Sequence, residues 1–431
     1  MNDLLFKIED FGPIHKLNMN LSKINVIAGI NGSGKSTASK ILYSFLISIS
    51  PEGINFYNDN LTDYYRNIRS HLWRFDENKQ YSELQDILRK TFDKIEIDDE
   101  ESSKSIFKKL LEVNSEEIKS ENFENLIKSS EKYFELKKSP AKRRSEIFKQ
   151  MISLEFEDNT SFRNYHSKLN LSTNDNSLDF SVNFPFEESS ITFHKEKFSI
   201  NDVFYIETPY IFDLENKRAV GLKKYNTNQN WLYHQKSLLN RLYSTIDHQE
   251  FDAMQTKLLS PGEHMELIDK MIDGGFDINK ISKQITYKTS DGEYLIRNTA
   301  SGIKTIGILK TLLNSKIDTN SFLILDEPEV HLHPEWQLEI AKIIVLLARD
   351  KKIHFYINSH SPQFIEAIEV FSEYYGIADE TNFYLSTLDE NVNKYVFNNV
   401  ERQEISTIYK NLGNPYNILN EFRGKNLSKH M

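Results

Sequence analysis

A glycine-rich segment at residues 29–36 has the types and spacing needed to hold a phosphate group: Gly29-Ile30-Asn31-Gly32-Ser33-Gly34-Lys35-Ser36. Glycines let the backbone curl until successive N–H groups point at one anion. A lysine can then reach the β- and γ-phosphates, and a serine hydroxyl can ligand Mg²⁺. Apolar residues at 21–28 and 37–49 predict the entering strand and the leaving helix that give the pattern its meaning.

Two carboxylates follow a second apolar run. Residues 322–325 predict a buried strand, and Asp326 and Glu327 come directly after it. Ligands bind at the carboxyl ends of parallel strands. We expect Asp326 to support Mg²⁺ and Glu327 to orient or deprotonate the attacking water. Taken alone, the same residues also fit an ordinary exit from a strand.

A histidine ends a third apolar run, residues 353–358, and the segment 299–304 precedes an amphipathic helix. His360 could contact a terminal phosphate, or it could simply bond to backbone. Ser301 and Gly302 could present free helix N–H groups to an anion. The alternative for Ser301 is an ordinary helix N-cap.

Together these segments resemble the ABC-type ATPases of the SMC/RecF-like branch. Residues 326–337 and 358–362 are similar to the OLD-like and PtuA-like ATPases of bacterial anti-phage defence. The resemblance covers about residues 1–50 and 284–431. It implies a head-to-tail dimer that holds two ATP molecules and Mg²⁺ between its protomers.

The resemblance also assigns roles to residues. Glu327 is the implied catalytic base, His360 the implied switch, and Ser36 and Asp326 the implied metal-binding residues. The implied nucleotide-binding residues are Gly29, Asn31, Gly32, Ser33, Gly34, Lys35, Ser36 and Thr37, with Ser301, Gly302 and Lys304 facing the other protomer's phosphate.

The chain departs from the family pattern at two places. The signature Leu-Ser-Gly-Gly-Gln is Ala-Ser-Gly-Ile-Lys here, and Glu207-Thr208-Pro209 stands where a glutamine loop is expected. Only their positions suggest Phe11 and His15 as adenine contacts.

Two further clusters have competing interpretations. Glu329, His331 and His333 could hold a metal, but a loop beside the dimer interface fits them better. The basic cluster Lys137, Lys138, Lys142, Arg143 and Arg144 could bind a nucleic-acid backbone; the solvated tip of a helical insertion is the favoured interpretation.

Composition excludes several classes of protein. The 431 residues carry 53 Lys and Arg against 63 Asp and Glu, a net charge of −10, so the whole chain is not a basic nucleic-acid binder. The absence of cysteine excludes disulfides, thiolate metal sites and a cysteine nucleophile. No signal peptide and no run long enough to span a bilayer is visible, which favours a cytoplasmic protein.

The expected fold is α/β, a P-loop ABC-type head with a mixed sheet, an antiparallel β subdomain and a helical insertion. Residues 1–54 and 284–431 form the expected head, with strands near 178–208. Residues 55–155 form the expected insertion and short arm, 156–205 the antiparallel part, and 206–283 a helical subdomain that leads to the signature-like segment.

The predicted function is that of an ATP-hydrolysing switch that controls a separate effector, for which a nuclease is favoured. OLD-like relatives often carry a Toprim nuclease, and about 70 residues after His360 are too few for one. The partners expected are therefore a second copy of the chain and an effector protein, with no membrane. The alternative is an SMC/RecF-like repair ATPase that binds DNA.

Overall fold

The computed structural model describes residues 4–57, 140–156, 166–184, 188–194, 200–207, 211–212, 232–252, 263–314, 317, 320–413 and 419–423. The chain divides into two compact units. One contains residues 1–51 and 148–431, and the other contains residues 52–147. Most of the predicted insertion, including Lys137 and Lys138, lies outside the described residues.

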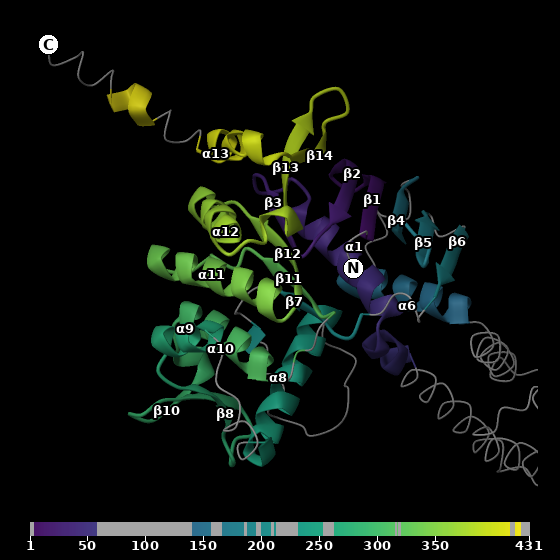
Figure 1. Cartoon of the computed structure of the whole chain (residues 1–431). Coiled ribbons are helices and arrows are strands. Elements are labelled where there is room, and N and C mark those ends of the chain that lie inside the picture. The colour runs from purple at the N-terminus through teal and green to yellow at the C-terminus, as the bar shows by residue number, and fades with distance from the viewer. Residues whose placement is uncertain are drawn as a thin grey trace, which may run out of the picture. The chain divides into compact units, whose positions relative to one another are not determined.

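The first unit is built on a sheet that combines parallel and antiparallel strands (Figure 1). Its order is β6-β5-β4-β1-β2-β14-β13-β3-β12-β11-β7. The strands are β1 Leu4–Phe11, β2 Ile14–Leu21, β3 Ile24–Ala28, β4 Lys168–Thr173, β5 Leu178–Asn183, β6 Glu188–Phe193, β7 Val203–Ile206, β11 Phe322–Asp326, β12 His354–Ser359, β13 Thr381–Asp389 and β14 Lys394–Val400. The α/β fold with a mixed sheet is confirmed.

The parallel strands lie together at one end of this sheet. β3 pairs in parallel with β12 and β13, and β11 pairs in parallel with β12 and β7. Every residue of β3, β7, β11 and β12 is buried, which explains their nearly continuous apolar sequences. Because these strands are parallel, the carboxyl ends of β3, β7, β11 and β12 lie at the same edge of the sheet.

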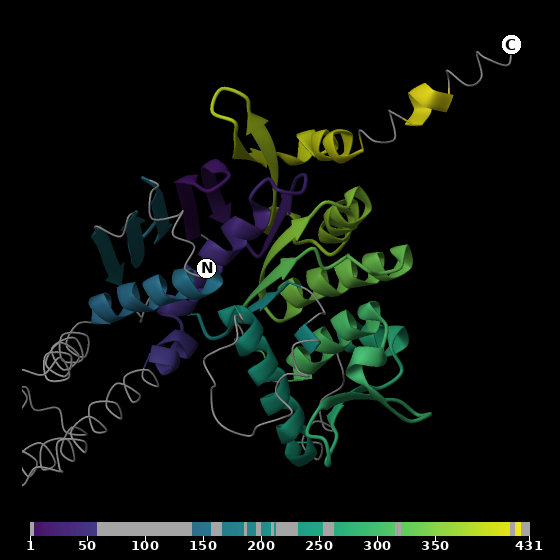
Figure 2. The same ribbon diagram turned by 180° about the vertical axis from the view of Figure 1, so that it is seen from behind.

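Helices cover both faces of the parallel strands. Figures 1 and 2 agree in placing α1 on one face and α11 and α12 on the other. The helices are α1 Lys35–Ile49, α6 Pro140–Glu155, α8 Tyr233–Asp252, α9 Glu263–Met271, α10 Ser301–Asn314, α11 Pro334–Asp350, α12 Pro362–Tyr374 and α13 Ser406–Leu412. An apolar core joins one face of the parallel strands to α8–α12.

A small second sheet has the order β10-β9-β8. Its strands are β8 Gly275–Ile278, β9 Ile285–Lys288 and β10 Glu293–Leu295, all antiparallel. The sequence predicts a hairpin here, with strands at 285–288 and 294–296 around a turn at 290–292, and this hairpin corresponds to β9 and β10, whereas β8 is not predicted. Short 3-10 turns at Ile296–Asn298, Ala378–Glu380 and Arg402–Glu404 connect larger elements.

Two predicted elements need correction. The expected strand at 21–28 is two strands, because Ser22 accepts a turn bond from Asn25 between the end of β2 and the start of β3. The sequence also predicts a final helical segment at about 403–422, but its described residues contain only a 3-10 turn, α13 and a helical turn at 419–423. The antiparallel part that is predicted within the head continues the head sheet, because β4 pairs with β1.

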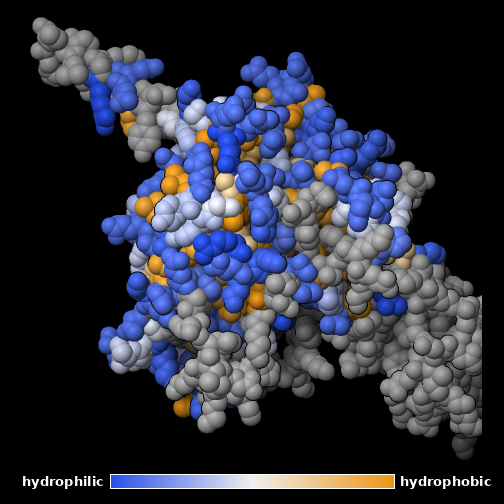
Figure 3. All heavy atoms as spheres, in the orientation of Figure 1, coloured by the Kyte–Doolittle hydropathy of each residue, from blue (hydrophilic) through white to orange (hydrophobic). Residues whose placement is uncertain are grey.

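Hydrophilic side chains dominate the face of the molecule seen in Figure 3, and hydrophobic ones are scattered among them. Within the described segments, no helix is both long and apolar enough to cross a bilayer.

Candidate functional site

The phosphate-binding loop connects β3 to α1, as predicted. Gly32 and Gly34 have φ angles of 78° and 94°, a backbone region that side chains with a Cβ rarely enter. Ser33 is buried, and its hydroxyl accepts a bond from Ser386 of β13 at 2.9 Å. Asn31 and Gly32 are exposed, and Thr37 is half-buried in the first turn of α1.

Lys35 lies under the loop it belongs to. Its Nζ donates to the carbonyl oxygens of Gly29 at 2.8 Å and Ile30 at 2.9 Å. Burial lowers the pKa of Lys35, while the charges of Glu327, Asp326 and Glu329 act against that shift. Lys35 is the only cationic side chain within residues 29–36, and its ammonium group interacts electrostatically with these three carboxylates.

Asp326 ends β11 beside the loop and is 5% exposed. Its Oδ1 accepts from Asn358 Nδ2 at 2.8 Å, and its Oδ2 accepts from the Tyr205 hydroxyl at 2.9 Å. Burial raises the pKa of Asp326, and bonds from Asn358, Ser36 and Tyr205 oppose the rise. Ser36, the other predicted metal-binding residue, thus lies near enough to Asp326 to lower its pKa, and a hydroxyl and a carboxylate oxygen together suit Mg²⁺.

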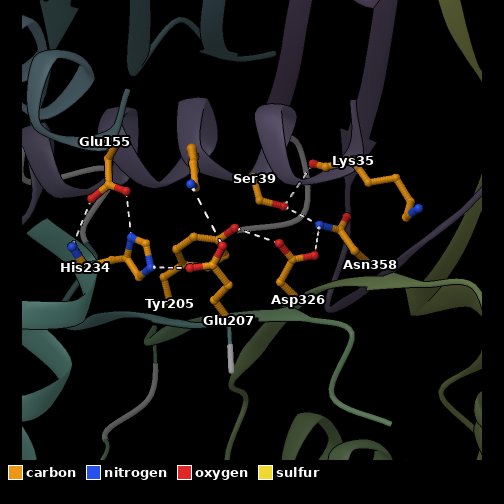
Figure 4. A network of polar contacts seen from close by, with 9 residues as sticks. Lys35, Ser39, Glu155, Tyr205, Glu207, His234, Asp326 and Asn358 are labelled. Atoms are coloured by element: carbon orange, nitrogen blue, oxygen red, sulfur yellow. Dashed lines mark hydrogen bonds and ion pairs between the residues drawn. The ribbon is translucent and has the colours of Figure 1, made fainter. Parts of the chain in front are cut away.

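Polar side chains near the start of α1 reach residues at the carboxyl ends of the parallel strands (Figure 4). Ser39 Oγ accepts from Asn358 of β12 at 2.6 Å. Lys40 Nζ lies 3.9 Å from Glu207 Oε1, directly after β7. These polar contacts fix the start of α1, and with it the loop, over the carboxyl edge of the sheet.

Glu327 and His360 meet across neighbouring strand ends. His360 Nδ1 lies 3.2 Å from Glu327 Oε1, with the two side chains 41% and 33% exposed. Glu327 has φ of 53°, and its N–H donates to Asn358 O at 3.0 Å. A glutamate in the left-handed region costs energy and is found where surrounding bonds enforce it. The structure thus brings the predicted base and the predicted switch together at the loop's edge.

A buried charged group, which the sequence did not reveal, lies beside this edge (Figure 4). His234 Nδ1 lies 2.6 Å from Glu155 Oε2, and its Nε2 lies 3.1 Å from Glu207 Oε2. Burial alone would lower the pKa of His234, but Glu155 and Glu207 outweigh it and raise that pKa. Burial also opposes ionisation of Glu207, yet bonding to His234 lowers the pKa of Glu207 to about 2. Glu207, the residue directly after β7, is therefore an ionised carboxylate near neutral pH.

The signature-like residues begin α10. Ser301 is its first residue, one position after the N-cap that the alternative interpretation assigned to it. A Cβ on Gly302 would lie 3.2 Å from Leu332 and 3.3 Å from Trp336, so the loop after β11 supports this end of α10. Lys304 is 6% exposed and its Nζ donates to Arg297 O at 3.4 Å, a contact that serves its own turn and gives no support to a phosphate contact.

Two positional suggestions have different outcomes. Phe11 is fully buried, with its ring 5.6 Å from that of Phe156 and 5.4 Å from that of Phe184, so it cannot stack on adenine. His15 is partly exposed, and its Nδ1 lies 2.9 Å from Asp10 Oδ1. An adenine contact at His15 therefore remains a prediction, whereas the suggested adenine contact at Phe11 is wrong.

The alternative metal cluster and the basic cluster are also changed by the structure. Glu329 is buried away from His333, whose Nδ1 accepts from Glu335 N as the N-cap of α11. Among the described residues, no three acidic or histidine side chains are grouped to hold a metal. In the basic cluster, Arg144 is buried and Arg143 lies over the Tyr57 ring, so these two do not form a solvated tip.

The comparison with known families identifies the class of this protein. The model of the AAA ATPase domain family matches residues 5–365. The chain belongs to that family and is an ATP hydrolase, which confirms the predicted enzyme class.

Individual relatives were also found. The protein named "Retron Ec83 probable ATPase" from Escherichia coli is 34% identical over 164 residues, which are 36% of this chain. The chain spans about 29% of that relative's length.

The comparison with solved structures found an SMC head domain from Thermotoga maritima. It is 11% identical, with 93% of this chain and 98% of that chain covered and a TM-score of 0.39. An SMC head bound to the C-winged helix domain of ScpA is 12% identical, with the same coverage and a TM-score of 0.40.

Proposed function

We propose that this ATPase is a nucleotide-controlled switch that dimerises head to tail and governs a separate effector protein in bacterial anti-phage defence. One observation supports the ATP site within it. The phosphate loop, Asp326, Glu327 and His360 come from three segments of the sequence and meet at one sheet edge. The resemblance to defence ATPases and the similarity to a protein named as a retron's probable ATPase support the biological setting.

In the proposed mechanism the backbone N–H groups of residues 29–36 and Lys35 bind the phosphates. Ser36 and Asp326 would hold Mg²⁺, which would neutralise charge on the phosphate oxygens. Glu327 would accept a proton from the attacking water, and His360, in contact with Glu327, would sense the terminal phosphate. Release of that phosphate would then change the contact between the two strand ends.

The assignment of Glu327 predicts a variant that binds but does not turn over. Glu327→Gln keeps the size of the side chain and removes the base, so we expect ATP hydrolysis to fall about 100- to 10,000-fold while ATP still binds. Single-turnover hydrolysis and ATP-induced thermal stabilisation measure the two effects separately. Lys35→Ala is the matched control, because it should remove the stabilisation as well.

Turnover of Glu327→Gln within a few-fold of wild type would show that another group activates the water. The effector is tested independently by native mass spectrometry of the chain isolated from its host with ATP and Mg²⁺. A bound second protein supports the switch. A bare homo-oligomer whose hydrolysis is stimulated by DNA would instead favour the repair ATPase.

A further inference from the structure

Glu329 is a buried acid to which the hydrolysis scheme gives no role. It is 3% exposed and lies in the turn between β11 and α11. Its Oε1 accepts from the Ser359 hydroxyl at 2.6 Å and from the His360 backbone N–H at 3.3 Å. Its Oε2 is also buried and finds no hydrogen-bond partner among the described residues.

These bonds join the two turns that carry the candidate base and the candidate switch. Glu329 is two residues from Glu327 on one turn, and it binds Ser359 and the backbone of His360 on the other. The side chains of Glu327 and His360 then meet at 3.2 Å on the exposed side of the same junction. The two turns are therefore joined twice, by the buried Glu329 and by the more exposed contact between Glu327 and His360.

The Ser359 hydroxyl extends this junction along the second turn. The Ser359 hydroxyl donates to Glu329, and its oxygen also accepts from the Ser361 N–H at 3.1 Å. This one hydroxyl therefore ties together the residues on either side of His360. Gln337 supports the same turns by donating to Leu332 O at 3.2 Å and accepting from Ser361 Oγ at 3.3 Å.

An acid is a costly choice for a purely structural contact here. Burial raises the pKa of Glu329, because a carboxylate loses its hydration in this position. Its two observed bonds occupy a single oxygen, and its charge also acts on Lys35. The side chain thus binds the backbone of the candidate switch histidine, and its charge acts on the lysine of the phosphate loop.

We propose that Glu329 is a positioning residue for ATP hydrolysis: it holds the Ser359 hydroxyl and the His360 backbone so that the His360 imidazole stays against Glu327. The proposal rests on the assignment of Glu327 and His360 to hydrolysis. Glu329 does not contact the reacting atoms and acts through the turn that it binds.

The test compares Glu329→Ala with Glu329→Gln in the full-length chain. Alanine removes the acceptor, so we expect kcat for ATP hydrolysis to fall about 10- to 100-fold with KM changed less than about threefold, since misplacement affects the reacting pair and not the loop. Glutamine offers an amide oxygen to the same two donors and should restore most of kcat. Glu335→Ala, an exposed glutamate 86% open to solvent on the next turn, is the control and should match wild type.

A double variant separates positioning from general destabilisation. If Glu329 acts through His360, Glu329→Ala/His360→Ala should be no slower than His360→Ala alone. Ser359→Ala should lower kcat in the same way and replaces Glu329→Ala if that variant does not fold. Additive losses, or wild-type kcat in Glu329→Ala or Ser359→Ala, would overturn the proposal.

The outcome distinguishes this proposal from the site assignment. Slow hydrolysis by Glu327→Gln and His360→Ala with normal hydrolysis by Glu329→Ala would remove only the role of Glu329. Normal hydrolysis by Glu327→Gln would remove both.

Discussion

The space at the first glycine of the phosphate loop is set by a strand from the far end of the sequence. A Cβ on Gly29 would lie 1.8 Å from Ser386 Oγ and 3.1 Å from Ser386 Cβ. Because Ser386 also bonds to Ser33, it cannot turn away without releasing the loop. The sequence motif names the glycine, but the reason for it at this position is β13.

We therefore expect Gly29→Ala to lose most of the ATP-induced rise in Tm, since overpacking typically costs about 1–3 kcal/mol and here it displaces the loop. Gly29→Ala/Ser386→Gly should recover part of that rise, because the second change removes the obstructing atoms. Thermal unfolding with and without ATP measures both. Gly292→Ala, where a Cβ would meet nothing within 4 Å, is the control. A full ATP response in Gly29→Ala alone would contradict the steric argument.

Among the elements, α6, α8 and the end of β7 are joined through one imidazole. His234 begins α8, Glu155 ends α6, and Glu207 follows β7. The raised pKa of His234 means that its contribution to stability is complete below about pH 6.5 and is lost as the pH rises through the folded-state value. The lowered pKa of Glu207 gives the opposite sign, with stability present above about pH 4.5 and lost as the pH falls toward 2.

His234→Gln should consequently destabilise the protein by about 3–5 kcal/mol near pH 6, because it leaves Glu155 buried beside a neutral group. The difference from wild type should shrink as the pH is raised, because wild-type His234 then loses its proton while glutamine does not titrate. Denaturant midpoints at pH 6, 7.5 and 9 report this trend. His166→Gln, at an exposed position, should show no trend. A pH-independent difference would mean that His234 does not change its protonation between pH 6 and 9, which would contradict the prediction.

The sequence was informative about elements and much less so about their neighbours. Continuous apolar runs identified the segments of β3, β7, β11 and β12, because strands buried on both faces need no alternation. The segments of β2 and β14 were not recognised as strands, and their pairing follows from contacts about 380 residues apart. Pairing over such distances has no local signal.

The same distinction holds within the site. The loop, Asp326, Glu327 and His360 belong to segments with recognisable local order, and their meeting follows from parallel strands ending at one edge. The contacts of Tyr205, His234 and Glu155 depend on packing between remote elements. Only the glutamate after β7, standing where a glutamine was expected, hinted at them.

For the whole molecule, the proposed head-to-tail dimer makes each ATP site composite. Lys35 and Glu327 would serve the site of their own protomer, whereas Ser301 would serve the site of the partner copy. Defects in different chains can then be separated onto different sites of a mixed dimer.

A mixture of two inactive variants should accordingly regain activity. Lys35→Ala and Ser301→Arg, mixed in equal amounts, should reach about a quarter of wild-type ATP hydrolysis, because half of the dimers are mixed and each has one intact site. Lys35→Ala mixed with Glu327→Gln should stay inactive, because both defects fall on the site of their own chain. Steady-state hydrolysis of the mixtures decides this. No recovery in the first mixture would argue against a shared site.

The position of β3 in the sheet also determines when this part of the protein can fold during synthesis. β3 carries the phosphate loop, yet both of its partners, β12 and β13, are encoded more than three hundred residues later. At a synthesis rate of about 5–20 residues per second, the nascent chain would wait roughly 20–70 s between emergence of β3 and arrival of its neighbours. During that interval an apolar strand next to a glycine-rich loop would be open to chaperones and proteases, so a slower ribosome would lengthen the exposure of the segment on which ATP binding depends.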